Sequence, residues 1–293
     1  MTLFGQSAGA TIVAGVLATR AADGLVRRAI VQSGSGLGAF APEQAARVTG
    51  AAAAALGVAP TAAGFADVPD ERLVEVVPGL GGLDLRTDDL FDPLVGLSRF
   101  SLVLDRQPAR SRLADVDLLV GTNAEEGNLY LAPQGNLASS TARDVRETAA
   151  AVHADPDALV AAHRARRPDA GHGELRSAIL GDALFGAGSR ALAEAHGAAH
   201  VYEFAWRSPA VDGLLGAAHA VEVPFVFGRL DLPGLVGPRG LLGPAEPPAS
   251  LAAEMRAAWL SFARSGDPGR PPNGRDGTIH RFGTTVRVST RTP

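Results

Sequence analysis

The chain contains no cysteine and no lysine, and all 27 of its basic residues are arginine. Without cysteine the protein has no disulfide framework, no cysteine nucleophile and no thiolate metal site, although this absence does not indicate a compartment. The absence of lysine, together with 35 glycines and 20 prolines, indicates a GC-rich coding sequence of the kind found in many bacteria. Neither absence points to an activity.

Long apolar runs and strong charge are missing as well. No stretch approaches the roughly 18 uncharged apolar residues that a membrane span needs, so no membrane partner is expected. A net charge of -4 without a long like-charged run gives no electrostatic footprint for nucleic acid, and no such partner is expected. A secretory signal peptide has a positively charged region, an apolar region and a cleavage site, and the sequence shows no such succession before the expected core. The default expectation is therefore a cytoplasmic protein without a secretory signal.

The residues that are present suit a large α/β domain. Of the 293 residues, 46% are apolar, which is ample material for a buried core. Apolar runs alternate with alanine-rich stretches, a pattern typical of a mainly parallel sheet flanked by helices. Strands are expected over 2–4, 28–32, 116–121 and 201–206, and helices over 10–20, 43–57 and 251–266. A polar helical region at about 140–197 is expected to form a lid over a site.

The first expected strand leads directly into GQSAG at residues 5–9, a glycine-x-serine-x-glycine sequence. Such a serine lies on a sharp turn between a strand and a helix, where its hydroxyl is exposed at the end of a sheet. The pentapeptide alone is only moderately specific, because a chain with 35 glycines contains such sequences by chance. The strand before Ser7 and the small-residue helix after it favour a nucleophile.

A serine hydroxyl becomes nucleophilic when a histidine takes its proton and a buried carboxylate orients the imidazole. Hydrolases with the serine on a strand-to-helix turn carry these groups in the order serine, acid, histidine. Ser7, Glu126 and His219 have this order, and each follows an expected strand. Five other histidines are interpreted as solvated or capping side chains: His153, His163, His172, His196 and His280.

Five collinear motifs resemble those of the type-B carboxylesterases, the family that also contains the cholinesterases: TLFGQSAGA, RAIVQSGS, LLVGTNAEEGNLY, HAVEVPFVFG and WLSFARSGDP. The resemblance implies an α/β-hydrolase fold and cleavage of a small carboxylic ester through an acyl-enzyme intermediate. It assigns Ser7 as nucleophile, Glu126 as triad acid and His219 as general base. It selects Glu126 over Glu125, a solvated loop carboxylate by default, because the family's acid directly precedes a glycine, here Gly127.

The same resemblance extends to residues around the triad. Ser33 and Glu222 match family positions next to the triad and are expected to support it through hydrogen bonds. The residue before the nucleophile is usually glutamate in the family but is Gln6 here, which removes a negative charge near the imidazolium. The backbone N–H of Ala8 is expected to donate one hydrogen bond to the oxyanion. The chemistry needs no metal and no organic cofactor.

The resemblance covers only the carboxyl-terminal part of the family, beginning at the nucleophile turn. Family members carry further strands before that turn, with a His-Gly-Gly type loop that supplies the other oxyanion donors. GLGG at 79–82 follows the nucleophile and is interpreted as a surface turn. Residues 1–293 are therefore expected to be the C-terminal part of a single carboxylesterase domain that lacks the N-terminal strands. The ester hydrolysis activity of this chain by itself is expected to be impaired. Met1 stands where the family often has valine, so an internal GTG codon is the expected origin of this start.

Two other classes of function remain open. One is a non-catalytic α/β-hydrolase-like interaction module, and the other is a fragment that needs a separate chain to supply the N-terminal half. Trp259 and Phe262 are expected to be core residues of a helix. Phe225 and Phe227 alternate and are interpreted as strand core rather than as an acyl pocket. Aromatic residues make up 5% of the chain, so no choline-binding aromatic lining is expected.

Overall fold

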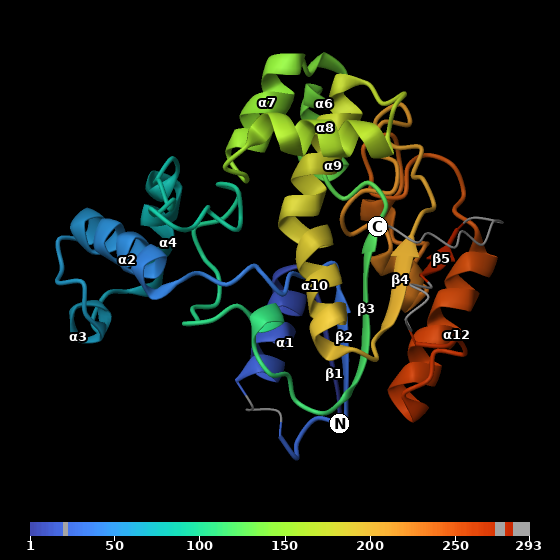
Figure 1. Cartoon of the computed structure of the whole chain (residues 1–293), viewed down its shortest axis with the longest axis horizontal. Coiled ribbons are helices and arrows are strands. Elements are labelled where there is room, and N and C mark those ends of the chain that lie inside the picture. Colours follow the sequence, from blue (N-terminus) through green and yellow to red (C-terminus); the bar gives the residue numbers. More distant parts are fainter. Residues whose placement is uncertain (20–22, 273–278, 284–293) are drawn as a thin grey trace.

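A computed structural model describes residues 1–19, 23–272 and 279–283. Its centre is a parallel sheet in which five strands are ordered as they occur in the chain (Figure 1). Residue pairs such as Gly5 with Val31 and Val31 with Val120 fix the register of the first three strands. The strands are β1 (Thr2–Gln6), β2 (Arg28–Gln32), β3 (Asp117–Asn123), β4 (His200–Phe204) and β5 (His280–Phe282). Strands were therefore correctly expected in four of these places.

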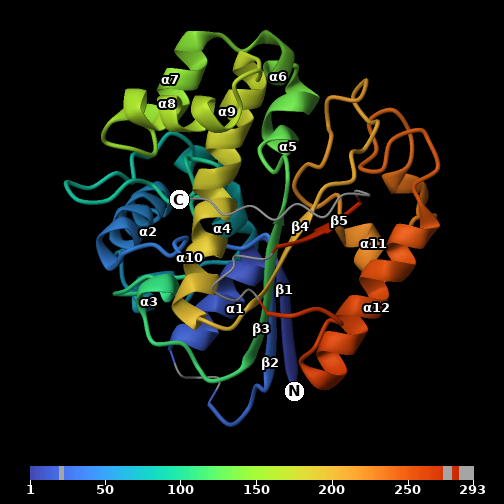
Figure 2. The ribbon, with the colours of Figure 1, turned by 45° about the vertical axis from the view of Figure 1, so that its right-hand side comes forward.

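Alternate residues of the central strands face two different apolar layers, because successive side chains of a strand point to opposite faces. Val31 and Val120 pack with α1 (Ala8–Ala18) and α10 (Ala187–His196) on one face. Ile30 and Leu119 pack with α12 (Ala249–Ser265) on the other. Figure 2 shows the sheet enclosed between α1 and α10 on one side and α12 on the other. This is the arrangement of an α/β fold with helices on both faces.

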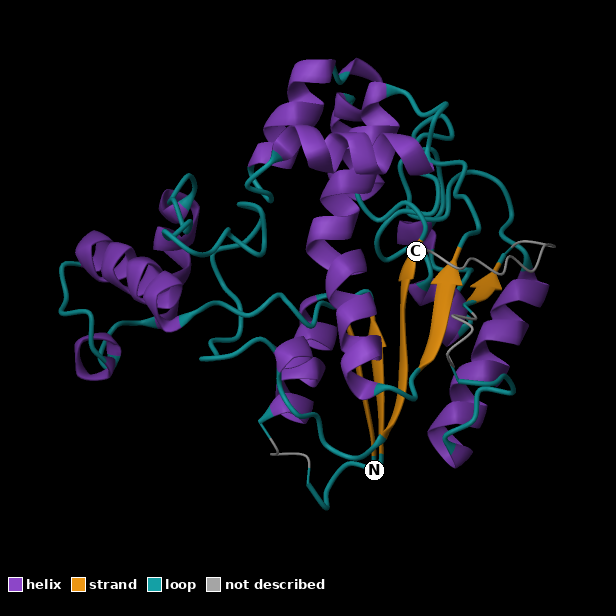
Figure 3. Ribbon diagram, viewed as in Figure 1, coloured by secondary structure: helices purple, strands orange, loops and turns teal. Residues whose placement is uncertain are grey.

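Most of the other helices lie outside the sheet layers, and long loops connect them (Figure 3). One group projects to the left of the sheet in Figure 1: α2 (Pro42–Leu56), α3 (Ala62–Phe65), α4 (Asp70–Val76) and η1 (Val77–Leu80). The short turns η2 (Pro108–Arg110), η3 (Ala132–Gln134) and η5 (Pro233–Leu235) lie in the loops. GLGG at 79–82 ends η1 beside α2, where Leu80 packs on Phe40.

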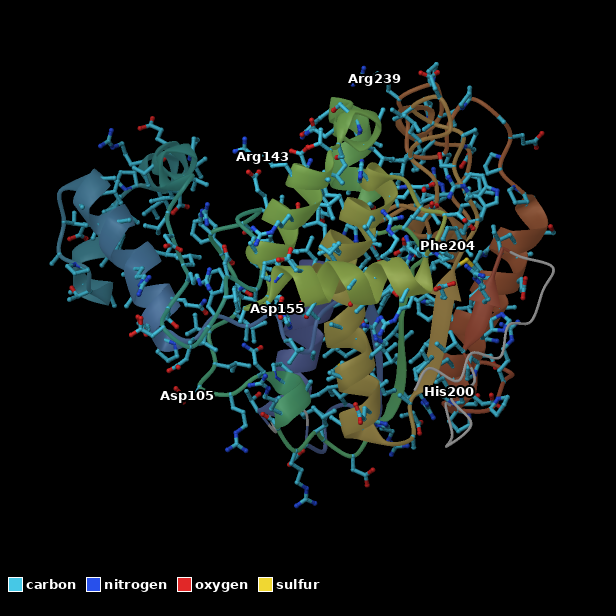
Figure 4. The ribbon with its side chains drawn as sticks, turned by 45° about the horizontal axis from the view of Figure 1, so that its top comes forward. Asp105, Arg143, Asp155, His200, Phe204 and Arg239 are labelled. Atoms are coloured by element: carbon cyan, nitrogen blue, oxygen red, sulfur yellow. The ribbon has the colours of Figure 1, made fainter. Side chains whose placement is uncertain are left out.

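The region at about 140–197 consists mainly of helices joined by short connections. Its upper part lies above the carboxyl ends of the strands in Figures 1 and 2, and its lower part, α10, packs on the sheet through Leu192. The elements of the upper part are α7 (Ala142–Ala150), α8 (Pro156–Arg166), α9 (His172–Gly181) and η4 (Asp182–Gly186), a π-helical turn. The short helices α5 (Asn128–Leu131) and α6 (Asn136–Ser139) directly precede this region in the chain. Figure 4 shows Arg143 of α7 and Arg239 of a nearby loop at the molecular surface.

The expectation of strand structure around Phe225 and Phe227 is wrong, because residues 223–227 form the short helix α11 (Val223–Phe227). Pro224 lies in its first turn, where the missing N–H is not needed, and Gly228 ends it in the left-handed conformation with φ 62°. Phe225 is buried, whereas Phe227 is exposed and stacks on Phe4 with ring centroids 6.0 Å apart. The alternation of aromatic residues therefore reflects the two sides of a helical turn.

Trp259 and Phe262 are buried on α12, as expected. Among the described residues, no helix has the length and apolar character that crossing a bilayer requires. The expected helix at 10–20 begins two residues earlier, at Ala8, and its expected end at position 20 lies outside the described residues.

A pair of glycine substitutions tests the packing of the sheet. A Cβ at Gly121 would lie 2.4 Å from the backbone oxygen and the ring of Tyr202, whereas a Cβ at Gly50 in α2 has open space. Gly121→Ala is expected to lower the free energy of unfolding by about 2 kcal/mol through overpacking. Gly50→Ala, the control, is expected to raise it by up to about 1 kcal/mol, since alanine favours a helix interior. Denaturant unfolding followed by circular dichroism measures both, and an unchanged Gly121→Ala midpoint contradicts the close approach.

Candidate active site

Ser7 lies on the turn between β1 and α1 with φ 56° and ψ -124°, a conformation that costs energy for any residue other than glycine. Its N–H donates to the carbonyl of Gln32 at 2.9 Å, and its carbonyl accepts the N–H of Thr11 at 3.0 Å. These two hydrogen bonds tie the strained residue to the end of β2 and to the first turn of α1. The hydroxyl is thereby held at the carboxyl edge of the sheet.

The two glycines of GQSAG have different environments. A Cβ on Gly5 would lie 2.4 Å from the carbonyl group of Gly9, so the backbone can turn this sharply only if residue 5 has no side chain. A Cβ on Gly9 would meet nothing within 4 Å. Gly5 is therefore the glycine that the turn requires.

The structure brings Ser7, His219 and Glu126 together in one chain of hydrogen bonds. The Ser7 hydroxyl lies 2.8 Å from Nε2 of His219, and Nδ1 of His219 lies 2.7 Å from Oε2 of Glu126. An ionised carboxylate can only accept, so Nδ1–H donates to Glu126 and Nε2 is free to accept from the hydroxyl. The imidazole is 4% exposed, so water has little access to either hydrogen bond.

Glu126 lies three residues beyond β3 and is 4% exposed. Its other oxygen, Oε1, accepts hydrogen bonds from the Ser33 hydroxyl and from the N–H of Asn123, both at 2.7 Å. Ser33 directly follows β2, so the acid is held between the ends of two neighbouring strands. Ser33 thus donates a hydrogen bond to Glu126, the residue expected to be the acid.

Glu222 is fully buried one turn after His219. Oε1 accepts from Nε2 of Gln32 at 2.7 Å, and Oε2 accepts from Nδ2 of Asn123 at 2.5 Å. Gln32 in turn accepts the indole N–H of Trp259 at 3.1 Å. Glu222 makes no direct hydrogen bond to the triad, and Asn123 joins the two carboxylates by donating to both.

Gln32, Asn123 and the indole N–H of Trp259 are polar members of this cluster that the motif analysis did not single out. Gln32 and Asn123 are the last residues of β2 and β3, and both are buried. A polar side chain at the carboxyl end of a buried strand is the signal in the sequence that points to them, because ligands and catalytic groups gather at that edge of an α/β sheet.

Two buried negative charges act on His219. Burial by itself lowers the pKa of His219, but the hydrogen bond and charge of Glu126, together with the charge of Glu222, raise that pKa above its ordinary value of 6.5. Burial and the neighbouring charge of Glu126 also raise the pKa of Glu222, against the two hydrogen bonds that favour its ionised form. The site therefore favours the imidazolium.

Two aromatic rings from helical elements contact the histidine. The ring of Phe185 is nearly parallel to the imidazole of His219, with centroids 4.2 Å apart and planes inclined by 8°. Tyr130 of α5 lies further away, with its ring centroid 6.1 Å from the imidazole. Burial and the charge of Glu126 raise the pKa of Tyr130 to about 12, so this phenol stays protonated.

The other expected residues lie around this centre. Nε2 of Gln6 is 3.4 Å from Nε2 of His219, so the side chain that replaces the family glutamate contacts the imidazole. Ala8 is the first residue of α1, where an N–H has no partner within the helix. Glu125 is only partly exposed: it forms an ion pair with Arg207 and accepts the N–H of Ala217 at 2.8 Å. Glu125 therefore anchors the loop before His219 rather than being solvated.

The other histidines lie away from the hydrogen-bond chain. His163 was expected to be solvated or capping but is buried, because α8 packs on α9. Its Nε2 lies 3.8 Å from the carboxylate of Asp182. Burial, opposed by the charge of Asp182, lowers the pKa of His163. Among residues 1–19, 23–272 and 279–283 there is no group of three or more His, Cys, Asp or Glu side chains that could hold a metal ion.

The first test of this geometry concerns the turn. Gly5→Ala is expected to destabilise the fold by about 1–3 kcal/mol or to displace Ser7, because the new Cβ meets the backbone of residue 9. Gly9→Ala is the matched control and is expected to change stability by less than about 0.5 kcal/mol. Thermal unfolding of both variants measures the difference, and equal stabilities contradict the stated role of Gly5.

The second test concerns the charge of Glu222. Glu222→Gln removes one of the negative charges that raise the pKa of His219, so that pKa is expected to fall. Titration of the His219 ring by NMR measures the shift, with the exposed Glu246→Gln as the control that leaves it unchanged. If the His219 pKa stays the same or rises in Glu222→Gln, the electrostatic assignment is wrong.

Comparison with known proteins places this geometry in a family. The profile of the Carboxylesterase family matches residues 1–284. The para-nitrobenzyl esterase of Bacillus subtilis (strain 168) is 29% identical over 280 residues, which are 92% of this chain and 54% of the relative. The phenmedipham hydrolase of Pseudarthrobacter oxydans is 28% identical over 290 residues, which are 92% of this chain and 55% of the relative.

Solved structures give the same result. The carboxylesterase of Geobacillus stearothermophilus superimposes with a TM-score of 0.76 at 26% identity, over 96% of this chain and 60% of the other. The chain thus spans little more than half the length of the relatives that it matches. The fold is the α/β-hydrolase fold of those neighbours in partial form, and the chain belongs to the carboxylesterase family.

Proposed function

We propose that the protein is a carboxylic-ester hydrolase that works through an acyl-enzyme intermediate, with Ser7 as nucleophile, His219 as general base and Glu126 as the orienting acid. One observation carries the proposal: the unbroken chain of hydrogen bonds from the Ser7 hydroxyl through both ring nitrogens of His219 to a buried carboxylate. Family membership supports ester hydrolysis as the reaction.

In the first half of the reaction, Ser7 Oγ attacks the ester carbonyl while Nε2 of His219 takes the hydroxyl proton. The resulting imidazolium is stabilised by Glu126, and it then gives its proton to the departing alcohol oxygen as the C–O bond breaks. In the second half, water loses a proton to Nε2 and attacks the acyl carbonyl, and the serine leaves with that proton. The charges that raise the pKa of His219 favour the imidazolium in both halves.

The proposed reaction has few hydrogen-bond donors for the oxyanion. The N–H of Ala8, at the start of α1, supplies one donor. The glycine-rich loop that supplies further donors in the family has no counterpart in the sequence, since GLGG at 79–82 lies beside α2. Loss of one oxyanion donor costs roughly 100- to 1000-fold in rate, so we propose that this chain alone is impaired to at least that extent.

A second chain or segment is the partner that this proposal calls for. Strand β1 is at one end of the described sheet, and each of its residues is only partly buried, in contrast to the buried residues of β2. Unpaired edge groups of a strand accept a further strand. We therefore propose that the chain is the C-terminal part of a carboxylesterase domain, with the helical region as its lid, and that an N-terminal half completes the sheet and the oxyanion site.

A non-catalytic interaction module is the alternative from another class. Such a module has no need for a strained serine, a buried imidazole and a buried carboxylate in hydrogen-bonding order, and all of these are present here. The geometry therefore favours the hydrolase. The names of two relatives refer to para-nitrobenzyl esters and phenmedipham, so an activated aryl or benzyl ester is a suitable probe.

The proposed nucleophile is tested by hydrolysis of para-nitrophenyl acetate. Ser7→Ala is expected to abolish turnover above the solvent rate while leaving the circular dichroism spectrum unchanged. The control Ser139→Ala, on the exposed end of α6, is expected to keep wild-type turnover. Turnover that persists in Ser7→Ala rules out the proposed nucleophile, and a folded wild-type chain without turnover contradicts ester hydrolysis by this chain alone.

A further inference from the structure

The π-helical turn η4 lies at the centre of a long helical segment that runs from α9 into α10. Its N–H···O bonds span five residues, and the N–H of Ala187 donates to the carbonyl of Asp182. Such turns carry one extra residue within a helix and often occur where a side chain must be presented at a functional site. Here the turn contains Phe185.

The local sequence supports this turn. The carboxylate of Asp182 accepts a hydrogen bond from Arg190 at 2.6 Å, which bridges the turn to α10. A Cβ on Gly186 would lie 2.5 Å from the Asp182 carboxylate, so glycine leaves the space that this carboxylate occupies. Asp182, Gly186 and Arg190 therefore stabilise the π-helical turn through this hydrogen bond and this close approach.

The same helical segment also packs on the loop that carries the triad acid. A Cβ added to Gly181 would lie 3.0 Å from Cβ of Glu126, and a Cβ added to Gly127 would lie 2.2 Å from the carbonyl oxygen of Ser177. The Ser177 hydroxyl donates to Oδ1 of Asn128 at 2.6 Å. The position of Phe185 is therefore fixed relative to the acid.

Phe185 restricts the movement of the imidazole. Its ring is nearly parallel to that of His219 at 4.2 Å, and it is 8% exposed. Rotation of His219 about its Cβ–Cγ bond would turn the edge of the imidazole into this ring. The face of a phenyl ring also carries negative potential, which attracts the imidazolium that forms during the reaction.

We propose that Phe185, presented by the π-helical turn at residues 182–186, is a positioning residue for His219: it holds the imidazole in the plane in which Nδ1 faces Glu126 and Nε2 faces Ser7. This role rests on the proposed function of the triad. It differs from simple core packing, because it acts through the ring face and not through the volume of the side chain.

Three substitutions separate these two roles. Phe185→Tyr keeps the ring face, whereas Phe185→Leu and Phe185→Met keep most of the apolar volume without a ring. Phe40→Leu removes a buried ring far from the site, in the group of apolar residues around α2, and serves as the control for loss of packing. Each variant is compared with the wild type as the full chain.

The readout that does not depend on turnover is NMR of the resting protein with 15N-labelled histidine, which reports the Nδ1 proton of His219. Phe185→Leu and Phe185→Met are expected to speed exchange of this proton with water about tenfold, the size of a typical aromatic-pair contribution. Hydrolysis of para-nitrophenyl acetate is expected to show a similar fall in kcat with KM within about twofold. Phe185→Tyr is expected to match the wild type in both measurements.

The proposal is overturned if Phe185→Met matches the wild type in proton exchange, or if Phe185→Tyr loses as much as Phe185→Met. It is also overturned if Phe40→Leu changes the His219 proton equally. These outcomes are distinct from failure of the proposed function, which Ser7→Ala decides by turnover. An altered His219 proton in a chain that fails the Ser7→Ala test still establishes the contact between Phe185 and the imidazole but removes its catalytic meaning.

Discussion

The arrangement of the site depends on one buried carboxylate. Glu126 accepts hydrogen bonds from three segments that are far apart in the sequence: Ser33 after β2, Asn123 at the end of β3 and His219 in the loop after β4. Because an isolated buried carboxylate costs several kcal/mol, each of these donors offsets part of the cost of burying Glu126. These hydrogen bonds thus tie His219 and the ends of two strands to one carboxylate.

A second buried carboxylate complicates this balance. Among the residues that the structure describes, no arginine forms an ion pair with Glu222, and its hydrogen bonds come from the neutral amides of Gln32 and Asn123. Burial and the like charge of Glu126 both raise the pKa of Glu222. The benefit falls on His219, whose pKa is raised by both charges against the effect of burial. Burying a second carboxylate thus lowers the stability of the fold, and its charge favours the protonated form of His219.

The sequence predicted those parts of the site that local motifs determine. GQSAG pointed to the turn at Ser7, and the order serine, acid, histidine together with the family motifs pointed to Glu126 and His219. Gln32, Asn123 and Phe185 could not be predicted in the same way, because their roles depend on contacts between segments that are far apart in the chain. Phe185 in particular contacts His219 from a π-helical turn, and helical periodicity gives no sign of such a turn.

Nucleophile activation and oxyanion stabilisation have different structural origins in this chain. The elbow at Ser7 is held by β2, through the carbonyl of Gln32, and by α1, through Thr11. None of the hydrogen bonds that orient Ser7, His219 and Glu126 involves the outer edge of β1. Ser7, His219 and Glu126 can therefore be ordered whether or not a further strand pairs with β1, whereas in the proposed reaction the oxyanion donors beyond Ala8 come from outside these elements. An ordered triad and a slow reaction are compatible properties of one molecule, because a nucleophile that is ready to attack still needs donors aimed at the charge that the attack creates.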